Sequence, residues 1–318
     1  MVIKEGEMKM KYVVGIDIGG TTVKIGLFTT EAELLDKWEV VTRKEDNGAY
    51  ILNDVAESVK AKLAEKGIAL SDITGAGVGV PGPVTADGVV KSCVNLGWGT
   101  FSVADTMTEL LGVPVKAGND ANVAALGEMW NGGAKGYKNV ILVTLGTGVG
   151  GGIIIDGKVV AGSHGAGGEI GHATVNPHEI VACNCGKKGC LEQYSSATGL
   201  IRSVKEALEK SDMPSILREM PDFMAKEILD AAKGGDEFAV LEVEKFCHIL
   251  GRALSVFAVV ADPEVIVIGG GVSKAGTYLT DMIQKYFDEY AFHACTAKVV
   301  LAELGNDAGI YGAAKLCM

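Results

Sequence analysis

One short segment of the chain concentrates side chains that bind metals. Three cysteines, Cys183, Cys185 and Cys190, fall within the run Cys-Asn-Cys-Gly-Lys-Lys-Gly-Cys, and His172 precedes them. Three thiolates and one imidazole supply the four ligands of a tetrahedral Zn²⁺. A complete ligand set predicts a closed, structural site with no open position for a reactive water. The alternative is three buried thiols without a metal, which the tight spacing and the two intervening glycines disfavour.

Two carboxylates flank this predicted metal centre. Glu169 stands in the segment Glu169-Ile170-Gly171-His172, and Glu192 follows the last cysteine. Carboxylates of this kind suit bidentate hydrogen bonds with sugar hydroxyls. Structural zinc contributes roughly 10–16 kcal/mol in small isolated modules. The sequence therefore predicts that the metal fixes the loop and, with it, both carboxylates.

Two glycine-threonine turns follow apolar runs far apart in the chain. The first is Gly19-Gly20-Thr21-Thr22 after Asp17, and the second is Gly146-Thr147-Gly148. Phosphate groups need several backbone N–H donors aimed at one point, and glycine lets the backbone approach closely. Asp17 is suited to hold Mg²⁺ or its water. Either turn alone fits a plain hairpin equally well, but the pair favours a clamp on a polyphosphate.

Other glycine patterns point to no known nucleotide-binding loop. The runs Gly146–Gly151 and Gly77–Gly82 satisfy G-x-G-x-x-G, yet one leads into an apolar strand and the other into prolines. The dinucleotide fingerprint requires a helix directly after the glycines. The G-x-x-x-x-G-K-[ST] pattern of P-loop kinases does not occur in the sequence.

A polar pair, Asn119-Asp120, lies where an expected strand over 113–117 meets an expected helix over 120–130. A carboxylate held there is able to accept a hydroxyl proton while Asn119 binds the substrate. The alternative is a helix N-cap, which Asn and Asp both favour. Taken by itself, the motif favours the cap.

The elements around these motifs predict an α/β protein with a mixed sheet in each half. Strand, Gly/Thr turn and strand occur twice, which suggests a duplicated architecture. Helices are expected over 51–63, 195–210, 238–261 and 277–290, with a buried strand over 265–268 and a closing strand and helix over 299–302 and 309–317. A length of 318 residues fits about two domains. We place the boundary near Gly118.

Composition narrows the class of partner. With 29 basic and 40 acidic residues the net charge is −11, so nonspecific binding to nucleic acid or to an anionic membrane is not expected. The first ten residues, MVIKEGEMKM, lack a signal-peptide core, and the apolar run 140–155 contains too many glycines for a membrane helix. Seven cysteines argue against a disulfide framework. We expect a cytoplasmic protein in which the other cysteines and histidines are structural.

Together these motifs resemble the ROK family of sugar kinases and repressors, and within it the bacterial ATP-dependent glucokinases. The resemblance covers nearly the whole chain from Tyr12 onward. It is carried by DIGGTTVKIGLF, GVGVPGPV, VNLGW, NDANVAALGE, LGTGVGGGIIIDGK, EIGH, CNCGKKGCLEQ and VIGGGVS. The cysteine segment is the most specific to the family, whereas the glycine turns occur across the wider actin-like ATPase superfamily.

The resemblance implies a two-domain actin-like ATPase (ribonuclease H-like) fold with mixed sheets and the active site in a cleft between the domains. The smaller domain would comprise residues 1–118 and a returning helix over 307–318. The larger domain, 119–306, would carry the zinc loop.

The resemblance also implies roles for individual residues. Those expected to bind ATP and Mg²⁺ are Asp17, Gly19, Gly20, Thr21, Thr22, Lys24, Gly146, Thr147, Gly148, Gly270 and Gly271, with the segment 269–272 lining the adenosine pocket. Those expected to bind the sugar are Asn95, Asn119, Asp120, Glu169, His172 and Glu192. The implied zinc ligands are His172, Cys183, Cys185 and Cys190, with His172 using one ring nitrogen for the metal and the other for the sugar. Asp120 would be the general base.

The implied activity is transfer of the γ-phosphate of ATP to O6 of glucose. Another hexose, N-acetylmannosamine as acceptor, polyphosphate as donor, and a non-catalytic sugar sensor remain alternatives. A repressor of this family would need a helix-turn-helix domain ahead of Tyr12, and about a dozen residues are too few for one. A homodimer or homotetramer is expected from the family.

Overall fold

The computed structural model describes residues 10–318, which form two compact units. Residues 1–9, which contain most of the segment judged too polar for a signal peptide, lie outside the described residues. Unit 1 comprises the chain up to Asn131, residues 161–167 and residues 306–318, and unit 2 comprises residues 132–160 and 168–305. The first division thus falls after Asn131 and not near Gly118, where the sequence analysis placed it.

Unit 1 is built on a five-stranded sheet in the order β3-β2-β1-β4-β7. Strands β1 to β3 are antiparallel neighbours, and β4 and β7 run parallel to β1. The strands are β1 (Tyr12–Ile18), β2 (Thr22–Thr29), β3 (Leu34–Val41), β4 (Ile73–Val80) and β7 (Val115–Asn119). Because β1, β4 and β7 are parallel, their carboxyl ends share one edge of the sheet. Asp17 and Asn119 stand at that edge.

The alternation of side chains along β1 separates two apolar layers. Val14, Ile16 and Ile18 face a core shared with α2 (Ile51–Glu65) and α3 (Val103–Leu111). Val13 faces the other side, where it meets α10 (Ala308–Leu316). The period of two therefore directs positions 13, 15 and 17 towards α10.

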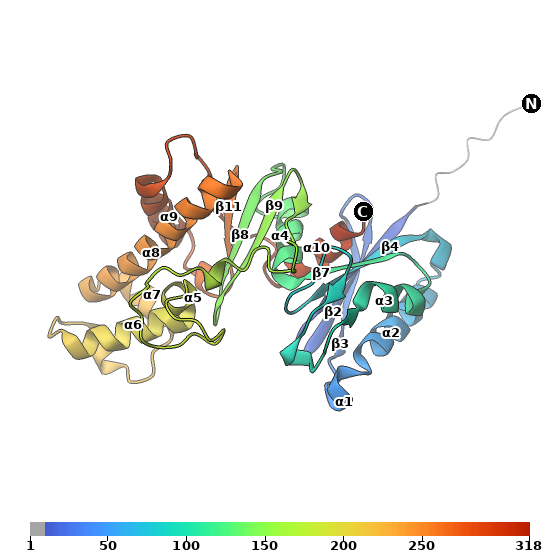
Figure 1. Ribbon diagram of the computed structural model, residues 1–318, viewed down its shortest axis with the longest axis horizontal. Coiled ribbons are helices and arrows are strands. Elements are labelled where there is room, and N and C mark those ends of the chain that lie inside the picture. Colours follow the sequence, from blue (N-terminus) through green and yellow to red (C-terminus); the bar gives the residue numbers. More distant parts are fainter. Residues whose placement is uncertain (1–9) are drawn as a thin grey trace, which may run out of the picture. The chain divides into compact units, whose positions relative to one another are not determined.

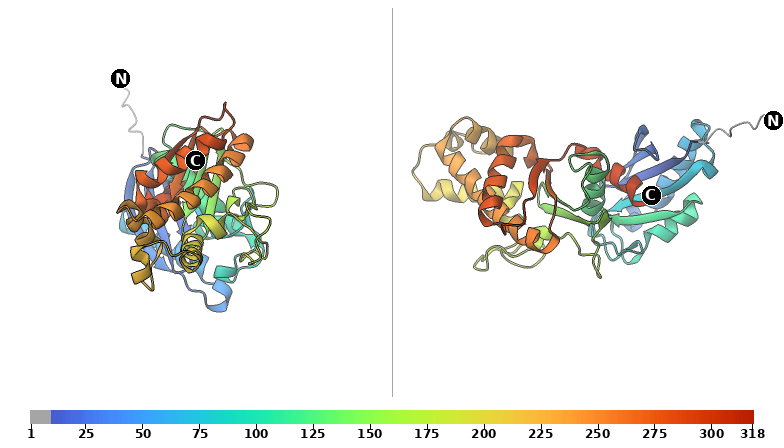
Figure 2. Two further views of the ribbon diagram at one scale, coloured as in Figure 1. Left: turned by 90° about the vertical axis from the view of Figure 1, so that its left-hand side faces the viewer. Right: turned by 90° about the horizontal axis from the view of Figure 1, so that it is seen from above.

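Close contact with α10 depends on small residues in the sheet. A methyl group on Gly77 of β4 would lie 1.7 Å from the carbonyl oxygen of Ala313, so only glycine fits there. Helix α4 (Asp120–Asn131) contacts α10 in the same way, because a methyl group on Gly312 would lie 1.6 Å from the carbonyl oxygen of Val123. These contacts make α4 part of unit 1. Figure 1 and the right-hand view of Figure 2 show α10 beside the strands of this sheet.

Unit 2 repeats the topology of the first sheet. Its order, β10-β9-β8-β11-β12, again has three antiparallel strands followed by two parallel ones. The strands are β8 (Val140–Leu145), β9 (Val149–Ile155), β10 (Lys158–Val159), β11 (Val265–Gly269) and β12 (Lys298–Leu301). The duplicated strand-turn-strand pattern in the sequence is thus a duplicated sheet.

The helices of unit 2 bury a single large apolar cluster against this sheet. The longest, α8 (Glu237–Ala261), lies beside α9 (Thr277–Tyr290), as Figure 1 shows. The others are α5 (Glu192–Ser195), α6 (Ala197–Lys210) and α7 (Ala225–Lys233). The helix expected over 195–210 begins only after Ser196, which is extended and caps the N–H of Gly199 with its hydroxyl at 3.0 Å.

Short elements complete the described chain. They are helix α1 (Glu45–Gly48), strands β5 (Val89–Val90) and β6 (Phe101–Ser102), and the 3₁₀ turns Leu70–Asp72, Val94–Leu96, Ile170–His172, Ile216–Glu219, Val272–Ala275 and Gly305–Asp307. Between residues 10 and 318, none of the helices combines the length and apolar character that crossing a membrane requires.

Candidate active site and metal centre

Asp17 occupies the end of β1 on the side that faces α10. A methyl group on Gly309, in the first turn of that helix, would lie 2.3 Å from Oδ2 of Asp17. Burial and the negative charge of Asp120 raise the pKa of Asp17 from 3.8 to about 6, against a lowering effect of Lys24. The carboxylate is therefore held in a place where its own ionisation is disfavoured. A cation bound beside it would relieve that cost, which fits the Mg²⁺ expected here.

The turn over 19–22 is fixed on its outer side by Thr42. The N–H of Gly19 donates to the carbonyl oxygen of Thr22 at 3.1 Å. The hydroxyl of buried Thr42 donates to the carbonyl of Gly19 at 2.8 Å, and its N–H donates to that of Thr21 at 2.9 Å. The hydrogen bonds that the carbonyl groups of the turn accept thus hold it in one conformation. Thr42 was not singled out from the sequence, because its partner strand is only brought alongside by folding.

Of two lysines in this region, one is bonded elsewhere within the protein and the other lies beside the turn. Lys24 was expected to bind nucleotide, but its ammonium group donates to the carbonyl oxygen of Asn306 at 3.0 Å. Lys44 was not predicted at all, yet its Nζ lies 3.6 Å from the position that a Cβ on Gly20 would take. An ammonium group therefore stands directly beside the glycine turn.

Asn119 and Asp120 lie where β7 meets α4, and Asn119 caps the helix. The side-chain oxygen of Asn119 accepts from the N–H groups of Ala121 and Asn122 at 3.0 and 3.1 Å, so Asn119 caps α4. Its amide nitrogen donates to the carbonyl of Gly82 at 3.0 Å. Asp120 is half-buried at the first position of the helix, and its charge acts on Asp17. Unit 1 thus brings these two carboxylates close together at one edge of its sheet.

The loop that carries Asn95 lies within electrostatic reach of Asp120. Asn95 is exposed in the 3₁₀ turn Val94–Leu96. Burial raises the pKa of the neighbouring Cys93 thiol, and Asp120 raises it further, which places this loop within electrostatic reach of Asp120.

In unit 2 the second turn joins β8 to β9 and is tied to the start of α6. The N–H of Gly146 donates to the carbonyl of Gly148 at 3.0 Å. The N–H of Ala197 donates to the carbonyl of Gly146 at 2.8 Å, and the hydroxyl of Thr198 donates to that of Thr147 at 2.5 Å. The carbonyl groups are thereby occupied within the protein.

The segment over 269–272 lies against this second turn. Gly270 has a φ of 82°, and a Cβ there would lie 2.5 Å from the carbonyl oxygen of Leu145. A Cβ on Gly271 would meet nothing within 4 Å. Glycine at 270 allows the ends of β8 and β11 to approach closely, and Gly271 leaves open space beside them.

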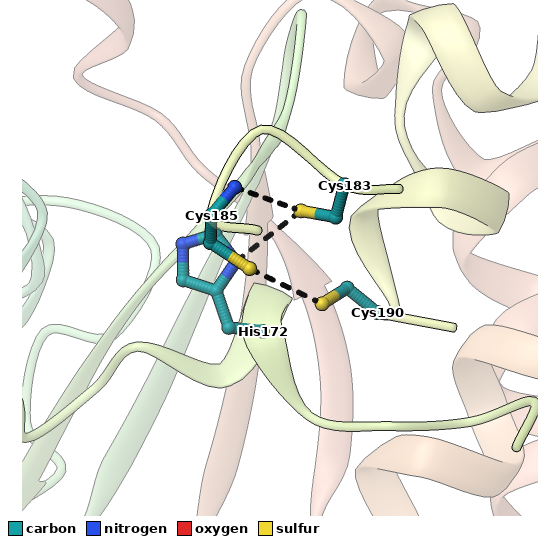
Figure 3. Close-up of side chains that lie close together, drawn as sticks. All are labelled: His172, Cys183, Cys185 and Cys190. Atoms are coloured by element: carbon teal, nitrogen blue, oxygen red, sulfur yellow. Dashed lines mark hydrogen bonds between the residues drawn. The ribbon is translucent and has the colours of Figure 1, made fainter. Parts of the chain in front are cut away.

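The four predicted metal ligands converge, as Figure 3 shows. Nδ1 of His172 lies 3.9 Å from Sγ of Cys183, and Sγ of Cys185 lies 3.6 Å from Sγ of Cys190. All four donor atoms lie within 4.8 Å of one another. Zinc–sulfur bonds of about 2.3 Å in a tetrahedron separate two sulfurs by about 3.8 Å. The donor set and its spacing therefore fit Zn²⁺.

The two flanking carboxylates lie on opposite sides of the His172 ring. Glu192 Oε1 accepts from the Cys183 thiol at 2.8 Å and lies 3.6 Å from Nδ1, while Glu169 Oε2 lies 3.9 Å from Nε2. Nδ1 therefore faces the cysteines and Nε2 faces away from them. Glu192 also approaches the second turn, since a Cβ on Gly148 would lie 2.6 Å from Oε2 of Glu192.

A polar network that the sequence analysis did not identify supports the zinc loop. Glu179 accepts from the hydroxyl of Tyr194 at 2.5 Å, from the N–H of Val181 at 3.0 Å and from Arg202 at 3.2 Å. These bonds lower the pKa of Glu179 from 4.5 to about 2. Arg202 also donates to the carbonyl of Gln193 at 3.0 Å. The network ties the segment before the cysteines to the helices after them.

The predicted residues therefore form two groups. Unit 1 gathers Asp17, the first turn, Asn119, Asp120 and the Asn95 loop. Unit 2 gathers the second turn, Gly270, Glu169, Glu192 and the four metal-ligand candidates. In each group, hydrogen bonds and close contacts between backbone segments bring the residues together. The spacing of the residues in the sequence does not reveal these contacts.

Comparison with known proteins identifies the lineage of this arrangement. The family model described as the ROK family matches residues 13–318. The chain belongs to the ROK family. A glucokinase of Halalkalibacterium halodurans is 43% identical to it, over 96% of this chain and 94% of the relative. The N-acetylgalactosamine kinase AgaK of a Shewanella species is 32% identical, over 95% of each chain.

A solved structure supports the same assignment. The ROK family glucokinase from Streptomyces griseus, in complex with glucose and AMPPNP, matches with a TM-score of 0.72 and 33% identity over 96% of this chain and 98% of its own. The fold is accordingly the two-domain actin-like ATPase fold of ROK sugar kinases, as the resemblance implied.

Proposed function

We propose that this ROK protein is a glucokinase that transfers the γ-phosphoryl group of ATP to O6 of glucose. The observation that carries the proposal is the pair formed by Asp17 and Asp120 beside the turn over 19–22. The pair combines a candidate base with a candidate metal-binding carboxylate at one edge of a sheet. The similarity to curated glucokinases supports glucose as the acceptor.

Asp120 serves as the general base in this mechanism. Its carboxylate accepts the O6 proton as that oxygen attacks the phosphorus, and helix α4 holds the side chain in place through the Asn119 cap. Phosphoryl transfer otherwise needs in-line positioning and stabilisation of charge. When Mg²⁺ is bound, it neutralises charge on the phosphate oxygens. Asp17 is the residue that would hold it or its water in unit 1.

Backbone N–H groups supply the remaining phosphate contacts. The carbonyl groups of Gly19, Thr21, Gly146 and Thr147 are all occupied by hydrogen bonds within the protein. Each turn is therefore held in a fixed shape while glycine keeps its surface open to the nucleotide. The segment over 269–272 is proposed to border the adenosine.

Sugar hydroxyls are proposed to bind Asn95, Asn119, Asp120, Glu169, His172 and Glu192. In unit 2 the zinc site would fix these groups in orientation, because Nδ1 of His172 faces the cysteines while Nε2 remains available on the opposite side. Zinc bound by four protein ligands supplies rigidity to the loop and no reactive water. Substrate specificity would then follow from the fixed positions of Glu169 and Glu192.

The test is a coupled assay of ADP release with purified protein, MgATP and a panel of hexoses and N-acetylhexosamines. We expect turnover to be highest with glucose. Asp120→Ala should lose at least about a hundredfold in kcat, the low end of general-base contributions, with no change in folding. Asp105→Ala is the matched control, because Asp105 is also an acidic residue in the first turn of a helix of unit 1 and should leave kcat unchanged.

Each outcome of that assay has a distinct meaning. Turnover with an N-acetylated sugar, the acceptor that the name of the Shewanella relative indicates for that protein, would keep the mechanism and change the substrate. Sugar binding without turnover would favour the sensor alternative. Polyphosphate in place of ATP tests the donor. Full activity of Asp120→Ala would remove Asp120 as the base.

We further propose a cytoplasmic homodimer or homotetramer. Three valines at positions i, i+3 and i+4 of helix α8, Val256, Val259 and Val260, are 60%, 62% and 84% exposed. A contiguous apolar stripe of this kind suits burial against a second copy of the chain. Light scattering on the purified protein, compared with Val260→Lys, would show whether that stripe mediates assembly.

A further inference from the structure

Lys44 stands beside the first glycine turn and has a free ammonium group. Its Nζ lies 3.6 Å from the position of a Cβ on Gly20. The structure gives this ammonium no hydrogen bond and no ion pair with residues 10–318. Its neighbour Arg43 differs, because its guanidinium pairs with Asp54 and covers the ring of Tyr50.

The ammonium group of Lys44 is also within electrostatic reach of the loop that carries Cys93 and Asn95. The charges of Asp120 and Lys44 both act on the Cys93 thiol, because Asp120 raises the pKa of that thiol and Lys44 lowers it. Lys44 and Asp120 therefore act on one thiol from within unit 1. In the proposed function the nucleotide lies at the turn and Asp120 holds the sugar, so the phosphoryl group would pass between the turn and Asp120.

Two other lysines of this sheet are already engaged. Lys24 donates to the carbonyl of Asn306 at 3.0 Å, and Lys37 pairs with Asp307 at 2.7 Å. Both bonds direct these lysines towards the segment before α10. In the described part of unit 1, Lys44 is thus the ammonium group that is both next to the turn and uncommitted.

We propose that Lys44 binds the transferred phosphoryl group, first in the transition state of the transfer and then as the 6-phosphate of the product. The inference rests on the proposed kinase function and deepens it by naming a catalytic cation that the glycine turn alone does not provide. In the reaction the O6–P bond forms, the bond from phosphorus to the bridging oxygen of ADP breaks, and the O6 proton passes to Asp120. Lys44 remains protonated throughout.

The chemistry explains why a cation is needed at this point. The γ-phosphoryl group carries negative charge on its three equatorial oxygens as it moves towards the sugar, while the electrons of the breaking bond stay with ADP. Backbone N–H groups supply partial charges only, whereas a positioned ammonium supplies a full positive charge on a flexible stem. An exposed lysine is able to follow the group over the distance that it moves. Lys44 would therefore stabilise the transition state and the phosphorylated product and leave free glucose unaffected.

The test compares Lys44→Ala, Lys44→Arg and Arg43→Ala with the wild type. Steady-state assays give kcat and the inhibition constant of glucose 6-phosphate, and calorimetry gives the affinity for glucose. We expect Lys44→Ala to lower kcat and the affinity for glucose 6-phosphate by roughly 10- to 100-fold, the range for loss of one hydrogen bond to a charged group. Glucose affinity and the unfolding temperature should not change. Lys44→Arg should retain most of the wild-type kcat and affinity for glucose 6-phosphate.

Arg43→Ala removes an adjacent positive charge of the same strand end, so it separates a specific contact from a general electrostatic effect. Equal losses in Arg43→Ala and Lys44→Ala would overturn the proposal. So would a loss of glucose affinity that matches the loss of product affinity, because that pattern indicates a disturbed sugar loop. Unchanged kcat in Lys44→Ala alongside an inactive Asp120→Ala would refute the role of Lys44 and leave the kinase function intact. No turnover by the wild type with any sugar would overturn both.

Discussion

The pKa values of two carboxylates, Asp17 in unit 1 and Glu179 in unit 2, are shifted in opposite directions. Burial and the charge of Asp120 raise the pKa of Asp17 to about 6. Tyr194, backbone N–H groups and Arg202 lower the pKa of Glu179 to about 2. The first is ionised at a cost to stability, and the second is ionised with a gain.

The difference separates a site arranged for chemistry from one arranged for support. A carboxylate that lacks compensating partners is ready for a cation or a proton that arrives with the substrate. A carboxylate with a full set of donors has no capacity left for a ligand, but it fixes the backbone around it. In this protein the second kind holds the loop that carries the candidate zinc ligands and Glu192.

The largest effect should come from the metal centre of unit 2. Cys190→Ser removes one of four ligands, and structural zinc is worth roughly 10–16 kcal/mol in small modules. We expect elemental analysis to find zinc in the wild type and none in the variant, and we expect the variant to lose glucose affinity. Cys295→Ser, a half-buried cysteine outside the cluster, is the control and should keep its metal. Retention of zinc by Cys190→Ser would remove Cys190 from the ligand set, and unchanged glucose affinity after loss of zinc would show that the Glu179 network alone holds the loop.

The next largest effect should be a gain in stability on removing the strained carboxylate. A group whose pKa is raised from 3.8 to about 6 in the folded state stabilises the fold below pH 3.8, and this contribution is lost as the pH rises through 6. Two pKa units correspond to about 3 kcal/mol at most. Asp17→Asn should therefore unfold at higher urea concentration than the wild type at pH 7, with much lower activity. The gap should narrow as the pH falls below 6.

That comparison should be made without nucleotide and divalent cations, because either would compensate the charge of Asp17. If Asp17→Asn were less stable than the wild type at pH 7, the carboxylate would be a structural residue like Glu179, and the contrast between the two units would fail.

A smaller change in stability, this time a loss, should follow from replacing Glu179, whose charge is compensated by its hydrogen-bond partners. The pKa of Glu179 falls from 4.5 to about 2, so its contribution is present above pH 4.5 and disappears as the pH falls through 2. Glu179→Gln should cost about 2 kcal/mol of unfolding free energy at neutral pH. The two proteins should converge in acid. Urea denaturation at several pH values measures the difference.

Lys226→Ala is the matched control for that measurement, because it breaks the exposed pair of Lys226 and Asp230 in the same unit. Such pairs contribute about 0.5 kcal/mol or less. A loss in Glu179→Gln no larger than in this control would mean that the network around Glu179 does not support the loop.

Local patterns were sufficient for several features of the site. The Cys-x-Cys-x₄-Cys run with His172 predicted a four-ligand cluster, and the structure brings those donor atoms together. The two glycine turns predicted paired hairpins, and both sheets have one in the same place. These features depend on residues close in sequence, where spacing nearly determines distance.

Features that depend on distant residues were missed or misplaced. Helix α4 was assigned to the second domain, but contact between Gly312 and Val123 makes it part of unit 1. Strand β3 was not predicted, because as an edge strand it alternates half-buried and exposed residues and lacks an apolar run. The Ser196 break was hidden inside a continuous helical pattern.

The sequence by itself determined the family, the duplicated strand-turn-strand plan and the four candidate metal ligands that the fold brings together, because each is encoded by residues within one or two elements. Only the tertiary structure decided which charged groups are compensated. Burial and Asp120 raise the pKa of Asp17, whereas Tyr194 and Arg202, both on helices, lower the pKa of Glu179 in its loop. Lys44 is left free beside Gly20. The energy of a charge depends on what surrounds it in space, and those surroundings exist only after the chain has folded.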